Sequence, residues 1–360
     1  MADDKKLADL RDQIDGIDEQ LSKLISDRAR LAQQVARVKG NTTENHFYRP
    51  EREAQVLRNV IKNNVGPLSE EELARLFREI MSACLALEQP LNIAYLGPEG
   101  TFTQTAALKH FGHSVVTSAL GSIDQVFREV ESGACHYGVV PIENSIEGVV
   151  NHTLDMLIDS RLLICGEVEI RIHHHLLTHA EKLGDIRKIY SHQQSLAQCR
   201  AWLDTHLPDI ERVAVSSNAE AAKLIGDQND IAAVAGETAA EYYHLPTLVR
   251  NIEDHPDNTT RFLVLGKHDT KSSGKDKTSI LFATPNRPGS LYQMLACFAE
   301  NKVSMTRIES RPSRVGMWDY VFFVDVEGHA GDAHVLAAVE CLQKSASMVK
   351  VLGSYPVAVL

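Results

Sequence analysis

The sequence of 360 residues contains no apolar run long enough to cross a bilayer, which takes about 20 residues. The N-terminal stretch Met1–Lys6 is polar and no apolar segment follows it, so we expect neither a signal peptide nor a membrane partner. Basic residues are in deficit, because 37 Lys and Arg stand against 48 Asp and Glu and leave a net charge of −11 at pH 7. That balance argues against nucleic acid as the main partner, and we expect a cytoplasmic protein.

Cysteine is sparse: six residues are scattered at positions 84, 135, 165, 199, 297 and 341, and no Cys-x-x-Cys pair occurs. This spacing predicts reduced cysteines in the core or near a site, and it gives no zinc motif. The run His173–His175, with His179, invites a metal interpretation, but neighbours on a strand point to opposite faces and no spaced ligand set accompanies them. The loop Gly97–Gly100 lacks the spacing of a dinucleotide or phosphate-binding fingerprint, so no cofactor is expected.

Apolar residues recur every three or four positions between Leu7 and Val38, which predicts one long helix packed along a partner. Arg28 interrupts the apolar face, and a buried guanidinium requires an anion, so one interpretation is an anionic ligand. The alternative is that Arg28 sets the register of a coiled coil. Arg11 and Lys39 lie roughly 25 Å and 16 Å from Arg28 at about 1.5 Å per residue. Arg11 can therefore join the same ligand only from a second, antiparallel copy, which predicts a homodimer or higher homo-oligomer.

Two further helices are predicted in this first region. Arg52 and Glu53 follow a proline that opens one of them, and Cys84 and Glu88 lie along one face of the other. Residues 1–90 are therefore expected to form an all-α domain.

The pattern changes after the helical region. Residues 91–267 alternate short strand-like runs with helical ones, as in an α/β domain. Residues 268–277 are polar and are predicted to form a linker. Residues 278–360 show the order strand, helix, strand, strand, helix, strand, which predicts an α+β ferredoxin-like βαββαβ domain.

Several motifs in these regions resemble those of known enzymes. In the α/β region the motifs are Gly97–Thr103, Pro141–Ser145, Tyr190–His192 with Gln194 and Gln198, and Asn258–Phe262. Together they resemble prephenate dehydratase. Asn286–Tyr292 and Glu309–Pro312 resemble the phenylalanine-binding motifs of an ACT domain. The cations of the helical region, with Glu53, resemble the all-helical chorismate mutase pattern.

The order of the three parts resembles the bifunctional chorismate mutase/prephenate dehydratase family over essentially the whole chain. That resemblance implies an all-α mutase domain, a two-lobed dehydratase domain similar to periplasmic binding proteins, and an ACT regulatory domain. It implies rearrangement of chorismate to prephenate, then decarboxylation and dehydration of prephenate to phenylpyruvate, with feedback inhibition by L-phenylalanine and no cofactor.

For the mutase, the resemblance implies that Arg28 and Arg11 of the partner subunit hold the substrate carboxylates. It implies that Lys39 reaches a carboxylate and the ether oxygen, while Arg52 and Glu53 form a nearby pair, with Glu53 a candidate for the substrate hydroxyl. The pericyclic reaction needs no nucleophile, only a compact conformer and charge stabilisation at the ether oxygen.

The sequence departs from one common mutase pattern at Arg49, Cys84 and Glu88. Cys84 stands where a serine is common, and Glu88 where a glutamine lies near the ether oxygen. A carboxylate there would repel the developing charge, whereas a protonated carboxyl donates to it. We therefore expect a raised pKa for Glu88 and a mutase activity that falls as the pH rises; the alternative is a solvated glutamate at a helix end.

For the dehydratase, the resemblance implies that Thr260 donates a proton or hydrogen bond to the departing hydroxyl. His192 is the rival acid, since histidine titrates near neutrality. The alternative is that Thr259 and Thr260 are ordinary strand residues. Further residues implied to line the substrate site are Thr101, Thr103, Glu143, Asn144, Ser145, Ser191, Gln194, Gln198, Arg261 and Phe262.

For the ACT domain, the resemblance implies a phenylalanine pocket between two copies, formed by Pro285–Tyr292 and Glu309–Pro312. Its expected residues are Pro288, Gly289, Ser290, Leu291, Tyr292, Glu309, Ser310, Arg311 and Pro312. The alternative is a dimerisation module that binds nothing. For the whole chain, the alternatives are a dehydratase with a non-catalytic helical dimerisation domain, and a non-enzymatic small-molecule sensor.

Overall fold

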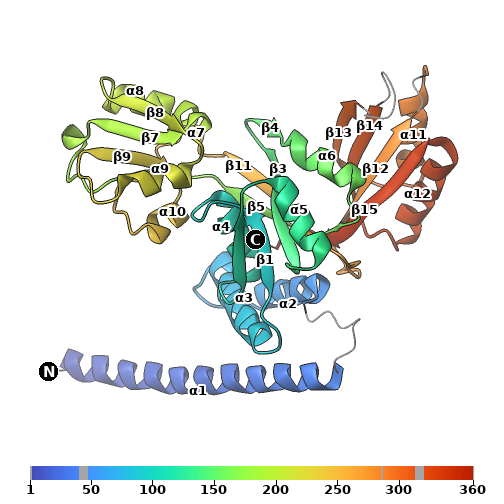
Figure 1. Cartoon of the computed structure of the whole chain (residues 1–360). Coiled ribbons are helices and arrows are strands. Elements are labelled where there is room, and N and C mark those ends of the chain that lie inside the picture. The colour runs from blue at the N-terminus through green and yellow to red at the C-terminus, as the bar shows by residue number, and fades with distance from the viewer. Residues whose placement is uncertain (1, 40–47, 285–286, 313–319, 360) are drawn as a thin grey trace.

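The computed structural model describes residues 2–39, 48–284, 287–312 and 320–359. Three bodies follow one another along the chain: a helical region, a two-lobed α/β region and a ferredoxin-like α+β region (Figure 1). The predicted order of all-α, α/β and α+β domains is therefore confirmed.

The helical region contains α1 (Ala2–Lys39), α2 (Pro50–Lys62) and α3 (Glu70–Ala86). Pro50 occupies the first turn of α2, and the Ser69 side chain caps α3 by accepting from the Glu72 backbone N–H. The long helix α1 extends beside the rest of the molecule and contacts α3 (Figure 1). Its apolar face is open to solvent in the single chain, since Ile14 is 56% and Leu24 65% exposed.

The first lobe of the α/β region is a mixed sheet in the order β2-β1-β3-β11-β5, with β4 paired to β3. Its strands are β1 (Asn92–Leu96), β2 (Val116–Leu120), β3 (Tyr137–Asn144), β4 (Gly148–Val149), β5 (Leu163–Arg171) and β11 (Thr259–Gly266). Its helices are α4 (Phe102–Phe111), α5 (Ile123–Ser132) and α6 (Asn151–Asp159). Strand β11 returns from the second lobe and lies antiparallel between β3 and β5.

The second lobe is a five-stranded sheet in the order β10-β6-β9-β7-β8. Its strands are β6 (His175–Leu177), β7 (Lys188–His192), β8 (Glu211–Val215), β9 (Ile231–Ala235) and β10 (Thr247–Val249). Its helices are α7 (Gln193–Gln198), α8 (Arg200–His206), α9 (Asn218–Ile225) and α10 (Glu237–Tyr242), with the 3-10 turn η1 (Leu183–Asp185). The chain thus crosses between the lobes after β5 and again before β11.

The C-terminal region has the predicted βαββαβ order, with the antiparallel sheet β13-β14-β12-β15. Its elements are β12 (Asp276–Thr284), α11 (Ser290–Glu300), β13 (Met305–Pro312), β14 (Tyr320–Glu327), α12 (Ala333–Ser345) and β15 (Met348–Pro356). One face of this sheet packs on α11 and α12. The other face joins the core of the first lobe, where Leu281, Phe323 and Leu352 pack with Ile142 and Leu263.

Strand β15 approaches the first lobe very closely at Gly353. A Cβ atom there would overlap the carbonyl oxygen of Ile164, and the φ of +145° also favours glycine. The two sheets are therefore in direct backbone contact.

The segment predicted as a linker is packed rather than free. Ser273 and Asp276 are buried, and the Arg58 guanidinium donates to the carbonyl oxygens of Ser273 (3.1 Å) and Lys275 (2.9 Å). Composition alone did not reveal that this polar stretch folds against α2.

The prediction of uniformly reduced cysteines was wrong for one pair. Cys297 on α11 and Cys341 on α12 form a disulfide, because the two helices lie side by side on the sheet and bring the Cα atoms to 5.7 Å. The other four cysteines are free and buried. Among the residues described, no helix is long and apolar enough to cross a membrane.

Candidate active sites

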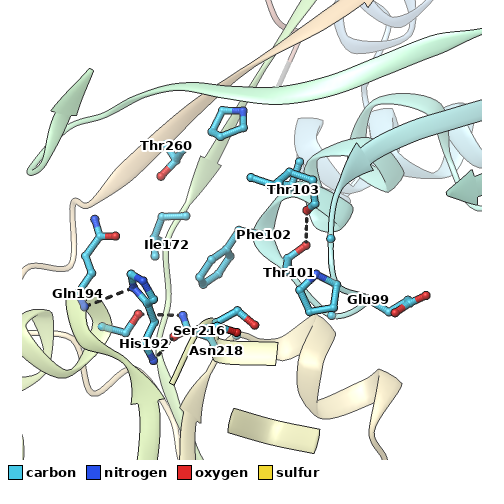
Figure 2. Close-up of a pocket in the computed structure, with 18 of the residues that line it drawn as sticks. Glu99, Thr101, Phe102, Thr103, Ile172, His192, Gln194, Ser216, Asn218 and Thr260 are labelled. Atoms are coloured by element: carbon cyan, nitrogen blue, oxygen red, sulfur yellow. Dashed lines mark hydrogen bonds between the residues drawn. The ribbon is translucent and has the colours of Figure 1, made fainter. Parts of the chain in front are cut away.

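A cavity of about 740 Å³ lies between the two lobes of the α/β region and is lined by both of them (Figure 2). The first lobe contributes the loop before α4 and the cleft-facing side of β11, and the second lobe contributes the start of α7 and of α9. Within the described part of this lining there is no Lys or Arg, and Glu99 is the carboxylate.

Two helices open into this cavity at their N-termini. Thr101 caps α4 by accepting from the Gln104 backbone N–H, and Ser217 caps α9 by accepting from the Glu220 backbone N–H. The partial positive charge and the unpaired N–H groups at such ends favour anions. One N-terminus from each lobe therefore provides anion sites without a basic side chain.

Thr260 faces the cavity from β11 (Figure 2). The Asn144 amide Nδ2 donates to Thr260 Oγ1 at 2.8 Å, and these two residues are register partners on β3 and β11. Because the threonine oxygen already accepts from Asn144, its own proton is available for a molecule in the cavity.

A buried hydrogen-bond chain supports this pair. Asn144 Nδ2 also donates to Asn258 Oδ1 (2.8 Å), and Asn258 Nδ2 donates to Gln198 Oε1 (3.3 Å). His174 Nε2 lies 2.9 Å from the same Gln198 oxygen. Since an amide oxygen only accepts, we assign the His174 proton to Nε2.

His174 was considered in the sequence only as an unlikely metal ligand, yet it lines the cavity. Burial lowers the pKa of His174 and keeps the ring neutral, and its Nδ1 atom has no hydrogen-bond partner among the described residues. His173 beside it is 38% exposed and pairs with the buried Glu253, whereas His174 and His175 are both buried, so no alternation in the sequence singled out the middle histidine.

His192 lies at the start of α7, on the second-lobe side of the cavity (Figure 2). Its Nδ1 atom accepts from the Gln194 backbone N–H, and its own backbone N–H donates to Asn218 Oδ1 at 3.1 Å. Asn218 also donates to Ser195 Oγ at 2.8 Å. Asn218 was missed in the sequence, although the serines directly before it are typical helix-capping residues.

The structure brings most of the predicted substrate residues to one cavity. They are Thr101, Thr103, Asn144, His192, Gln194, Gln198, Thr260 and Phe262. Ser191 instead lies beneath the lining, where its hydroxyl oxygen lies 2.7 Å from the Val234 carbonyl oxygen and 2.9 Å from Asn218 Oδ1. Ser145 donates to Asn258 Oδ1 and accepts from the Thr259 backbone N–H, which fixes the turn after β3.

Two expected substrate residues, Glu143 and Arg261, lie on the opposite side of the sheet from the cavity. Arg261 pairs with Glu167 and Asp325, and Glu143 pairs with Arg307. Their expected place in the substrate site is corrected, because alternate side chains of β3 and β11 point to opposite faces. Other lining residues that the sequence analysis missed include Phe102, Ile172 and Ser216.

The predicted mutase residues do not surround one cavity in the single chain. Arg11 is exposed and Arg28 half-buried on α1, while Arg52 is exposed on α2. The side chain of Lys39 lies outside the described residues. Cys84 is buried on α3, and Glu88 follows that helix and is half-buried.

Glu53 instead faces the α/β region. Its carboxylate lies 3.7 Å from Arg78 Nε, and both line a cavity of about 400 Å³ with Tyr48 and Lys109. Burial raises the pKa of Glu53 to about 7, against the opposing effect of Arg78. The sequence could not show this, because the direction in which Glu53 points depends on how α2 docks.

The expected effector residues lie at the exposed side of the C-terminal region. Gly289 caps α11 in a left-handed conformation (φ +85°), and Tyr292 is 76% exposed. Leu291 packs against the core, and Pro288 and Ser290 flank the cap. Glu309, Ser310 and Pro312 lie on the strand β13 at the edge of the sheet. Pro285 and Asn286 lie outside the described residues.

Arg311 has a different environment from the one expected. It pairs with Asp155 (2.7 Å) and Asn151 of α6 across the contact between the C-terminal sheet and the first lobe.

Comparison with known families divides the chain in the same way. The profile described as "Chorismate mutase type II" matches residues 10–89, "Prephenate dehydratase" matches residues 93–270, and "ACT domain" matches residues 278–340.

Individual proteins resemble the chain over its full length or over about three quarters of it. A bifunctional chorismate mutase/prephenate dehydratase of Pseudomonas aeruginosa is 56% identical over 365 residues and covers 100% of both chains. The enzyme of that name from Neisseria gonorrhoeae is 51% identical and covers 99% of both. A solved structure of prephenate dehydratase in complex with L-Phe from Arthrobacter aurescens is 34% identical, with a TM-score of 0.69, covering 74% of this chain and 90% of that one.

Proposed function

The chain belongs to the family of bifunctional chorismate mutase/prephenate dehydratases. From this premise we propose which residues carry out each activity. It is an enzyme with both activities: it rearranges chorismate to prephenate and converts prephenate to phenylpyruvate. We assign the mutase to residues 1–90, the dehydratase to residues 91–267 and regulation to the ACT domain, residues 278–360.

The dehydratase site is the cavity between the lobes, and Thr260 is its proton donor. As the carboxylate leaves as carbon dioxide, its bonding electrons enter the ring, which becomes aromatic while the hydroxyl leaves as water. Thr260 delivers the proton that the leaving hydroxyl takes, and it regains one from solvent after turnover. Asn144 holds the threonine oxygen so that the proton points away from the sheet.

Prephenate carries two carboxylates, and the two helix N-termini match that pair. The start of α4 in the first lobe takes one carboxylate and the start of α9 in the second lobe takes the other. A dianion that bridges the lobes favours their closure and the exclusion of water. The absence of Lys and Arg from the described lining supports this use of backbone N–H groups.

The mutase site requires a homodimer. Two antiparallel copies of α1 cover each other's exposed apolar faces and bring Arg11 of the partner subunit to Arg28 and Lys39. The 25 Å that roughly separates Arg11 from Arg28 along one helix is the reason that a single chain does not complete the site.

The ACT domain binds L-phenylalanine as a feedback inhibitor, at the N-terminus of α11 beside β13. The left-handed Gly289 lets the backbone approach an amino acid, and the exposed edge of β13 allows a second ACT domain to close the pocket. No cofactor takes part in this proposal, and the cytoplasm remains the expected location.

The observation that carries the dehydratase proposal is the 2.8 Å hydrogen bond from Asn144 to Thr260 inside the cleft. The test offers chorismate to the purified protein without cofactor and follows prephenate and phenylpyruvate, with and without L-phenylalanine. Thr260→Val is expected to accumulate prephenate at an unchanged mutase rate, whereas Thr260→Ser keeps the hydroxyl and part of the activity. Full phenylpyruvate formation by Thr260→Val would reject Thr260 as donor.

A further inference from the structure

Four charged residues join the dehydratase domain to the ACT domain directly behind the dehydratase cleft. Arg307 Nε lies 2.7 Å from Glu143 Oε2, and Arg261 Nη1 lies 2.6 Å from Asp325 Oδ2. Glu143 and Arg261 are register partners on β3 and β11, and Arg307 and Asp325 are register partners on β13 and β14. We call these four residues the interdomain quartet; charges alternate in sign around it.

The quartet is largely withdrawn from water. The side chains of Arg261, Arg307 and Asp325 are 13%, 12% and 6% exposed, and that of Glu143 is 38% exposed. Tyr355 accepts from Arg261 at 2.9 Å, and Ser279 donates to Asp325 at 2.5 Å. Charges in such a setting hold each other in place, because displacing one partner leaves a buried charge with fewer partners, although Arg261 then still pairs with Glu167.

The Asn144–Thr260 pair lies on the same two strands, one residue away from the quartet. Asn144 follows Glu143 on β3, and Thr260 precedes Arg261 on β11. Strand alternation turns Asn144 and Thr260 to the cleft and turns Glu143 and Arg261 to the ACT domain. Each strand therefore carries one group of the cleft pair and, next to it, one contact to the ACT sheet.

In the ACT domain, too, the two residues of the quartet lie on neighbouring paired strands. Arg307 and Asp325 belong to paired strands of a sheet that shares its core with the first lobe. A movement of that sheet reaches β3 through Arg307 and β11 through Asp325, and one that displaces these two residues unequally shifts the two strands relative to each other. The distance that such a shift changes is the one between Asn144 Nδ2 and Thr260 Oγ1.

We propose that Glu143, Arg261, Arg307 and Asp325 are positioning residues that set the Asn144–Thr260 geometry according to the state of the ACT domain. The proposal rests on the proposed function, in which Thr260 is the donor. An effector that favours another arrangement of the ACT sheet then lowers turnover without entering the cleft.

The experiment measures kcat and KM for prephenate in the full chain, with the mutase rate and the melting temperature recorded on the same samples. Arg307→Met and Asp325→Asn each remove one ion pair. Lys350→Met is the matched control, because Lys350 also crosses to the dehydratase domain but donates to the Leu157 and Ile158 carbonyls, away from β3 and β11.

We expect kcat to fall about tenfold in Arg307→Met and Asp325→Asn, with KM within about twofold and weaker inhibition by L-phenylalanine. The control should retain wild-type kcat. A double variant that carries both Glu143→Arg and Arg307→Glu exchanges the two charges and can form the ion pair again. Its kcat should recover to within about threefold of wild type, because the two residues act as a pair. If Arg307→Met does not fold, Arg307→Lys takes its place. This variant keeps the positive charge but alters the contact with Glu143.

The proposal is overturned if folded single variants keep wild-type kcat, or if the charge exchange is as slow as the single variants. A wild-type chain that forms prephenate but never phenylpyruvate, or a Thr260→Val variant with full activity, instead overturns the proposed function.

Discussion

At the scale of single residues, the groups that surround Thr260 in the proposed dehydratase site are neutral. Thr260 is a weak acid, and its use as a donor depends on how firmly Asn144, Asn258 and Gln198 fix its oxygen. A preorganised chain of this kind costs little reorganisation when the substrate reacts. The neutral His174 completes the chain at its far end.

Replacing His174 should therefore slow the dehydratase. His174→Ala leaves Gln198 without its ring donor and loosens Asn258, so we expect kcat for prephenate to fall roughly tenfold or more. His206→Ala, which removes an exposed histidine stacked on Trp202, serves as the control. Steady-state assays with prephenate measure both, and equal kcat values for the two variants would contradict the role given to His174.

Glu88 gives a second prediction at this scale, for the mutase. If the carboxyl donates to the ether oxygen only when protonated, the mutase rate falls as the pH rises, because ionisation replaces a donor by a repelling charge. Glu88→Gln keeps a donor at every pH, so its rate should stay flat where that of the wild type declines. Chorismate disappearance between pH 5 and 9 measures the difference, and parallel profiles would disprove the idea.

At the scale of elements, helices and strands could be predicted from neighbouring residues in the sequence. Contacts that depend on how these elements pack against one another could not. The period of α1 and the strand and helix order of the ACT domain follow from nearby residues, and both were predicted correctly. Asn258–Phe262 was treated as one motif, although strand alternation separates Arg261 from Thr260 and Phe262. The bond between Cys297 and Cys341 joins cysteines 44 residues apart in the sequence, and only the packing of their two helices on one sheet brings the thiols together.

Helix α2 carries a pH-dependent contact at Glu53. The pKa of Glu53 is raised from 4.5 to about 7 in the folded chain. Between these two pH values the folded chain therefore keeps the Glu53 proton, whereas the unfolded chain releases it. The contribution of Glu53 to the free energy of unfolding is therefore fully present below about pH 4.5. It is lost as the pH rises through 7, which lowers the free energy of unfolding by up to roughly 3 kcal/mol.

Glu53→Gln removes that decline. We expect its melting temperature to exceed that of the wild type by a few degrees at pH 8, with little difference at pH 5. Glu211→Gln, which neutralises a carboxylate exposed to 62%, is the control and should show no such trend. Thermal unfolding at several pH values tests this, and a difference that does not change with pH would refute the assignment.

At the scale of the whole molecule, the exposed apolar face of α1 and the position of Arg11 on it both support the proposed homodimer. A helix with Leu24 at 65% and Ile14 at 56% exposure is stabilised by burying that face against a partner. The cavity proposed as the dehydratase site is lined by residues of one chain, so the two activities should respond differently to dissociation.

Mixing two inactive variants tests the shared mutase site directly. Arg11→Ala and Arg28→Ala should each abolish mutase activity as homodimers, since every site then lacks one of the two cations. After joint refolding, half of the dimers are mixed, and each mixed dimer has one site with Arg28 from one chain and Arg11 from the other, so about one quarter of wild-type activity should return. Dehydratase activity in the same samples stays constant and reports the amount of folded protein. A mixture that stays inactive would place both arginines in the site of a single chain, in conflict with their separation along α1.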